Sequence, residues 1–139
     1  NLTEPPDDIT PFTVDLLEAF VRVYLANGTG RGSVITFIHG VTGPGAVNLM
    51  APSLLPDINR VALRYAWQAS AALYAAIGRE IDRAPHDAYD EPVEDLVTRA
   101  VETRDEHAVK FTEVCVRAHR MDPRPIFLVA ANHAIERLK

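Results

Sequence analysis

The sequence VITFIHGVTGPG, residues 34–45, decides how this chain folds. An apolar run leads into a segment rich in glycine and proline, and a single imidazole, His39, lies where the two meet. Because glycine and proline weaken a helix interior, we expect a short helix over 33–39, a break at 40–43 and a new helix from 44 to about 55. The apolar neighbours of His39 predict a buried ring, which needs hydrogen-bond partners unless it serves a function.

On both sides of this segment, apolar residues recur every three or four positions, the spacing of helices with one buried face. No segment alternates apolar and polar residues in the way that a half-buried strand does. The predicted fold is therefore all-α, an irregular bundle of about six helices. Outside the opening segment, the expected helices are at about 11–26, 58–82, 92–102, 106–120 and 126–138.

Residues 1–10 are rich in proline and acidic side chains, which predicts an extended arm or linker before a helical domain over 11–139. The chain begins with asparagine rather than methionine. We therefore expect a processed product or part of a longer polypeptide, with the helical domain belonging to a larger helical protein or complex.

Composition narrows the classes of partner. The net charge is −5 and no basic stripe occurs, which argues against nucleic acid or an anionic membrane as the main partner. No uninterrupted apolar run reaches the roughly 20 residues of a membrane span. The single cysteine, Cys115, lies between two valines, so we expect a buried, reduced thiol and a cytoplasmic protein.

The common catalytic signatures are absent: no phosphate-binding loop, dinucleotide fingerprint, H-E-x-x-H, paired-cysteine or nucleophile-elbow motif occurs. The candidates for chemistry are therefore histidines. We expect His86 and His119 to be solvated and His133 to be packed in the core. His107 shares the apolar arc of its predicted helix, and Lys110 follows it by one turn.

Two inward histidines on separate helices, His39 and His107, form half of a metal site, although two hydrogen-bonded core histidines are the more common arrangement. Lys110 is a poor ligand while protonated. It would have to be buried, which lowers its pKa, or carboxylated to provide an oxygen ligand.

Several short motifs occur in a characteristic order: FIHGVTGP at 37–44, LL at 54–55, LRY at 63–65, YAAIGRE at 74–80 and DEHAVK at 105–110. In this order the chain resembles the C-terminal half of the questin oxidase-like family, over about residues 34–115. The resemblance implies a helical enzyme that uses oxygen to cleave polycyclic aromatic ketones. Baeyer–Villiger oxygenation and chemistry at a histidine-held non-haem iron are competing accounts of that family.

Carried onto this sequence, the resemblance implies that His39 and His107 are catalytic and that His39 binds the metal. His107 would be a second ligand, or would orient the site from behind the ligands. Lys110 would be a further ligand, and Thr42, Trp67 and Tyr74 would contact an apolar substrate. NADPH is a further candidate cofactor. Family members carry additional closely spaced histidines, but no two histidines here lie within four residues of each other. The missing N-terminal segment or a second chain would then complete the site, so we also expect an oligomer or complex.

Two other interpretations stay open. The chain is a non-catalytic helical interaction module with structural histidines, or it is a metal-free ligand-binding domain in which Tyr65, Trp67 and Tyr74 line an apolar pocket. Loss of bound iron on changing His39 would favour the oxygenase, whereas a loss of stability alone would favour the module.

Overall fold

A computed structural model describes residues 10–87 and 89–139. Within them the chain forms six α-helices, one short 3₁₀ turn and no strand, so the prediction of an all-α fold with about six helices is confirmed. The elements are α1 Thr10–Asn27, α2 Arg31–Met50, η1 Ala51–Ser53, α3 Pro56–Ile77, α4 Val93–Glu102, α5 Glu106–Met121 and α6 Pro125–Leu138. The arm predicted for 1–10 lies outside the described residues, apart from Thr10, which begins α1.

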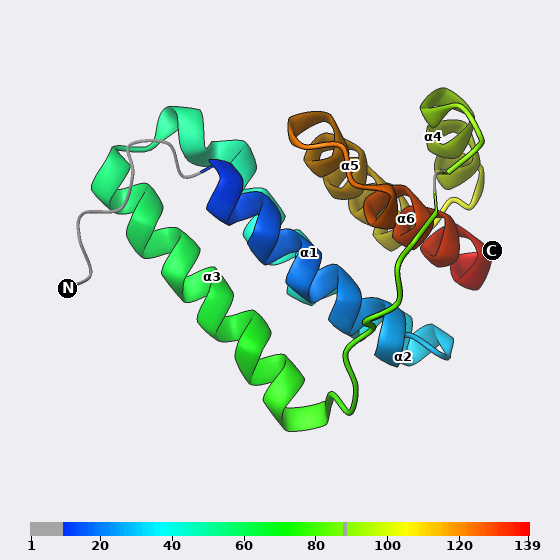
Figure 1. The fold of residues 1–139 in the computed structure, drawn as a ribbon, viewed down its shortest axis with the longest axis horizontal. Helices are drawn as coiled ribbons and strands as arrows, with labels where there is room; N and C mark the ends of the chain where they lie inside the picture. The colour runs from blue at the N-terminus through cyan, green and yellow to red at the C-terminus, as the bar shows by residue number, and fades with distance from the viewer. Residues whose placement is uncertain (1–9, 88) are drawn as a thin grey trace.

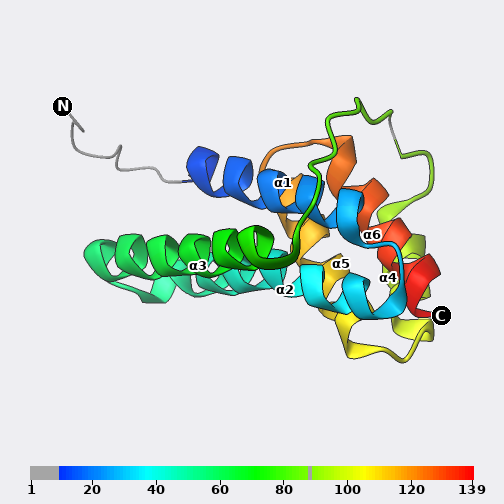
Figure 2. The same cartoon turned by 90° about the horizontal axis from the view of Figure 1, so that it is seen from below.

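The helices form two unequal parts around α1 and α2 (Figure 1). On one side α5 and α6 pack together with α4 against them, and on the other α3 lies along α2. The core between α1, α2, α5 and α6 includes the fully buried side chains of Tyr24, Phe111 and Phe127. In Figure 2 the α2–α3 hairpin extends beyond this core, so much of α3 is covered on one side alone.

Helix α2 is continuous from Arg31 to Met50, so the predicted break at 40–43 is wrong. Pro44 lies in the helix interior, where its missing N–H leaves the carbonyl of Gly40 without its intrahelical donor. The hydroxyl of Ser70 on α3 supplies a replacement, with its Oγ 2.8 Å from the Gly40 oxygen and 3.0 Å from that of Ala66. A hydrogen bond from α3 thus replaces the backbone donor that Pro44 lacks in α2.

The same segment brings α2 close to α5. A β-carbon added to Gly45 would lie 2.7 Å from both methyl carbons of Val114, so the glycine permits the close approach. Arg117 fixes it by donating from Nη2 to the carbonyl of Gly45 at 3.0 Å and from Nη1 to the side chain of Asn48. Gly40 therefore lies against α3, whereas Gly45 lies against α5.

Together with the turn at 51–53, α2 is long and apolar enough to cross a membrane by length and composition, a property that core helices of folded proteins share. In this fold α2 contacts α1, α3, α5 and α6.

The first part of the connector between α3 and α4 is held against α1. Arg22 donates from Nη1 to the carbonyls of Asp82 and Ala84, both at 3.2 Å. His86 is partly buried and its Nε2 lies 2.5 Å from Oδ2 of Asp82, so the expectation that His86 is solvated is wrong. His119 is also partly buried, with Nδ1 3.0 Å from the carbonyl of Arg124.

His133 packs into the core, as expected from its apolar neighbours. Its Nδ1 lies 2.8 Å from the hydroxyl of Tyr24, and the two rings meet edge to face. Burial raises the pKa of Tyr24, so the phenol stays protonated and donates to the imidazole. Burial, aided by the positive charge of Arg137, lowers the pKa of His133 below its ordinary value of 6.5.

Replacing Ser70 by alanine should leave the Gly40 carbonyl buried without its donor. We expect the free energy of unfolding to fall by about 1–3 kcal/mol in urea denaturation. The exposed Ser53→Ala serves as the control. In a Pro44→Ala background, where the missing N–H is restored, the loss caused by Ser70→Ala should be smaller. An equal loss in both backgrounds would contradict this account of how α2 stays continuous.

The lowered pKa of His133 makes stability depend on pH. The unfolded chain binds more protons than the folded chain between the folded-state pKa and the ordinary value of 6.5, so the free energy of unfolding should rise with pH across that range. It should fall as the pH drops below about 6.5. His133→Gln, which keeps an acceptor near Tyr24 but does not titrate, should show a shallower slope in urea midpoints. An unchanged slope would show that other groups cause the dependence.

Candidate functional site

The structure places His39 of α2 and His107 of α5 next to each other. Their ring centres are 5.5 Å apart and the ring planes meet at 84°. His39 is exposed, however, so its predicted burial is wrong. The core-facing side of α2 contains Ile38 and Val41, whereas the neighbouring His39 turns about 100° away from Ile38 toward the surface. Apolar neighbours in sequence therefore did not surround this residue in space.

Asp105 orients the ring of His107. It is the N-cap of α5, and its Oδ1 accepts the backbone N–H of His107 at 2.9 Å and lies 3.0 Å from Nδ1 of the same residue. Arg31 pairs with the other carboxylate oxygen at 2.6 Å. Because the ionised carboxylate accepts a hydrogen bond from Nδ1–H, the neutral ring carries its lone pair on Nε2. His107 thus presents a ligand nitrogen in a defined orientation.

The charge on Asp105 is retained in this setting. Partial burial by itself would raise the pKa of its carboxyl, but the hydrogen bonds from the His107 backbone and ring, and the charges of His107 and Arg31, lower that pKa below its ordinary range. A carboxylate behind an imidazole is the usual arrangement around metal-binding histidines, because it fixes the ring and raises its basicity. His39 makes no hydrogen bond through its ring to any residue in 10–87 or 89–139.

Lys110 is not buried, as a neutral lysine ligand would have to be. Its side chain is 64% exposed, and Nζ donates to Oε2 of Glu106 at 2.5 Å. Hydrogen bonding to Lys110 lowers the pKa of the Glu106 carboxyl, as expected beside a charged ammonium group. The burial that would favour a neutral lysine is therefore absent, so of the two conditions for a Lys110 ligand only carboxylation is left.

A groove of about 420 Å³ lies between α2 and α5, and neither histidine is among its lining residues. Thr42 follows His39 by one turn and Lys110 follows His107 by one turn, and both line the groove. Its other lining residues are Ala46, Leu49, Val109, Glu113, Val114 and Arg117. The groove is apolar along its length, with charged groups on the α5 side.

The aromatic residues predicted to bind substrate are on α3. Trp67 is 47% exposed and Tyr65 62% exposed, both on α3, and Tyr74 is partly buried on the same helix. None of the three lines the groove that contains Thr42. These residues therefore do not form a single pocket with Thr42.

In the part of the chain that the structure describes, no group of three or more histidine, cysteine, aspartate or glutamate side chains could hold a metal ion. His39 and His107 supply at most two nitrogen donors. Sequence reasoning missed the role of Asp105, although an aspartate two residues before a histidine at the start of a helix is a recognisable cap.

Comparison with models of known families, with curated proteins and with solved structures gives no match for this chain.

Replacing Asp105 by alanine should remove the cap of α5 and the partner of the His107 ring together. We expect the free energy of unfolding to fall by about 1 kcal/mol, since loss of an N-cap aspartate typically costs 0.5–2 kcal/mol. The exposed Asp90→Ala provides a matched control on the connector. In NMR spectra the ring signals of His107 should shift as Nδ1 loses its acceptor. Unchanged ring signals would show that Asp105 does not orient the imidazole.

Proposed function

We propose that this chain supplies half of a histidine metal site in a questin-oxidase-like oxygenase, which oxidises a polycyclic aromatic or ketone substrate. The observation that carries the proposal is the meeting of His39 and His107, with Asp105 behind one ring and a groove one turn away. The order of the sequence motifs from 37 to 110 adds the class of chemistry.

The residues fit one half of a non-haem iron site. A metal–nitrogen bond of about 2.1 Å puts each imidazole centre roughly 3 Å from the ion, so two ligand rings have centres about 4.5–5.5 Å apart. The observed separation of 5.5 Å lies at the upper end of that range. When bound, iron would supply the means to activate dioxygen next to the substrate.

Each nearby side chain has a role that its position supports. Asp105 holds the ring of His107 and keeps its Nε2 unprotonated in the neutral form. Thr42 offers a hydroxyl to a carbonyl oxygen of a substrate in the apolar groove. In this proposal Lys110 lines the groove as the ion-paired partner of Glu106 and is not a ligand. NADPH stays a prediction of the resemblance alone.

The remaining ligands must come from another segment or chain, and the exposed apolar surface of the α2–α3 hairpin supports such a partner. Ile58, Val61 and Tyr65 follow one another along α3 with 53%, 51% and 62% of their surface exposed. Leu49 and Leu55, near the turn between the two helices, are 61% and 73% exposed. Surfaces of this kind mark protein contacts in folded proteins.

The same surface also supports the second candidate function, a non-catalytic helical interaction module. In that case His39 and His107 would be neighbours without a shared ligand. The two functions differ in one measurable property, the affinity of the histidine pair for a divalent metal.

Titration with Co²⁺, a paramagnetic substitute for iron, tests the proposal by NMR. The ring signals of His39 and His107 should broaden first and together, before those of His86, His119 and His133. His39→Ala and His107→Ala should each weaken binding by at least tenfold, because one of two donors is lost. The connector variant His86→Ala is the control and should bind as the unaltered chain does.

Equal broadening of all five histidine rings, or binding that neither alanine variant weakens, would overturn the metal-site proposal and favour the interaction module. Iron analysis of the chain purified with its partner extends the test. Near-stoichiometric iron that is lost on His39→Ala supports the oxygenase.

A further inference from the structure

The side of α3 that faces away from α2 carries a regular row of exposed residues. The buried residues of the helix, Asn59, Leu63 and Ser70, lie on one side, and Ser70 binds the Gly40 carbonyl of α2. At about 100° per residue, the opposite side contains a row that we name the α3 seam: Ile58, Val61, Tyr65, Gln68, Ala72 and Ala75. All of them are exposed, so no helix among the described residues covers the seam, and Figure 1 shows α3 at the edge of the molecule.

The seam has the spacing and the composition of a helix–helix contact. Its members follow one another by three and four residues in turn, which is the heptad pattern of paired helices. None of them is charged, and α3 contains no charged residue at all from Tyr65 to Ile77. A helix face that stays in water normally carries charged side chains. The seam is therefore suited to contact with another helix rather than with solvent.

Side-chain size changes along the seam in a way that selects its partner. The large residues Ile58, Val61 and Tyr65 form its first half, and Gln68 and two alanines form the second. Two copies that run in the same direction would put alanine against alanine and leave the second half poorly packed. In opposite directions, each large residue faces a smaller one: Ile58 the partner's Ala75, Val61 the partner's Ala72 and Tyr65 the partner's Gln68. The seam is thus complementary to itself, as a two-fold contact between identical chains requires.

Charges at the two ends of α3 favour the same orientation. Asp57, in the first turn, has a side chain that is 92% exposed and pairs with Arg60 at a long 3.4 Å. Arg79, just beyond the last turn, is exposed, and its side chain has no hydrogen bond or ion pair within 10–87 or 89–139. An antiparallel pair brings Asp57 within about one turn of the partner's Arg79 at both ends. A parallel pair would gather both aspartates at one end and both arginines at the other, where like charges repel.

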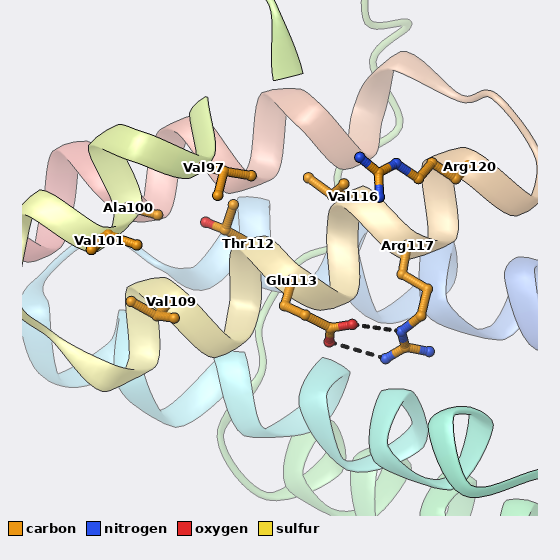
Figure 3. Close-up of a pocket in the computed structure, with 9 residues that line it drawn as sticks. All are labelled: Val97, Ala100, Val101, Val109, Thr112, Glu113, Val116, Arg117 and Arg120. Carbon is orange, nitrogen blue, oxygen red and sulfur yellow. Dashed lines mark hydrogen bonds and ion pairs between the residues drawn. The ribbon is translucent and has the colours of Figure 1, made fainter. Parts of the chain in front are cut away.

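A second exposed apolar surface, the groove between α4 and α5, lacks these properties (Figure 3). Its valines lie beside the ion pair of Glu113 and Arg117, in which Nε is 2.7 Å from Oε1. Figure 3 shows Arg120 at one end of the groove. Charged groups therefore interrupt this surface, whereas the α3 seam has none.

We propose that two copies of this chain associate through the α3 seam, antiparallel about a two-fold axis that passes between Tyr65 and Gln68. The seam contains neither His39 nor His107, so this inference goes beyond the metal-site proposal and assigns part of the apolar hairpin surface to a second copy. The contact uses a single helix of each chain, so we expect a dissociation constant on the order of 10 µM.

Sedimentation equilibrium of the full chain from about 1 µM to 1 mM tests the association. Val61→Lys and Ala72→Glu should each raise the dissociation constant about tenfold or more, because each puts a charge into an apolar layer. Both changes in one chain should recover most of this loss, since the introduced lysine and glutamate face each other in the antiparallel pair. Val101→Lys, at an exposed valine of α4, is the matched control and should have no effect.

Cysteines placed in the seam test its orientation. Ile58→Cys and Ala75→Cys face each other across an antiparallel pair, so mixing the two variants under mild oxidation should give a mixed, disulfide-linked dimer. Neither variant alone should cross-link, because identical positions then lie at opposite ends of the contact. The natural Cys115 is buried and stays out of the reaction. All substituted positions are exposed, so the melting curves should stay close to that of the unaltered chain.

Three results would overturn the proposal. One is a chain that stays monomeric at about 1 mM, which would leave the seam to a different protein. Another is a dimer that Val101→Lys weakens and Val61→Lys does not. The third is cross-linking of either single-cysteine variant with itself, which indicates a parallel pair. Because Val61→Lys retains both histidines, its Co²⁺ titration measures metal binding separately, and failure of one proposal leaves the other standing.

Discussion

The hydrogen bond from the Ser70 hydroxyl to the carbonyl of Gly40 is the contact on which the arrangement of this fold depends. Proline at position 44 removes the donor that this carbonyl would otherwise have, and a kink or a break is the usual result. Because α3 supplies the donor, α2 continues through the proline. Helix α2 therefore depends on α3, its partner in the hairpin, to continue through Pro44.

The continuity of α2 places the candidate site. His39 lies before the proline and Gly45 after it, on one continuous helix. The close contact of Gly45 with Val114, held by Arg117, sets how α5 crosses α2. That crossing brings His107 beside His39, and the cap formed by Asp105 at the start of α5 orients its ring.

Helix α5 has a different role on each of its faces. Its buried face contributes Phe111 and Cys115 to the core, and full burial raises the pKa of the Cys115 thiol, which is inert for that reason. Its row of Val109, Glu113 and Arg117 lines both grooves, one between α2 and α5 and one between α4 and α5. The ion pair of Glu113 and Arg117 therefore lies between the two grooves.

The sequence by itself determined the helical class, the approximate limits of α1, α4, α5 and α6, and the core positions that recur every three or four residues. These properties are local, because propensity, capping and periodicity act within a few turns. Tertiary structure decided that α2 is continuous, that His39 is exposed and that Lys110 is paired in solvent. Each of these depends on which helix covers a given face, and a partner such as Ser70, distant in the chain, leaves no periodic signal near Pro44.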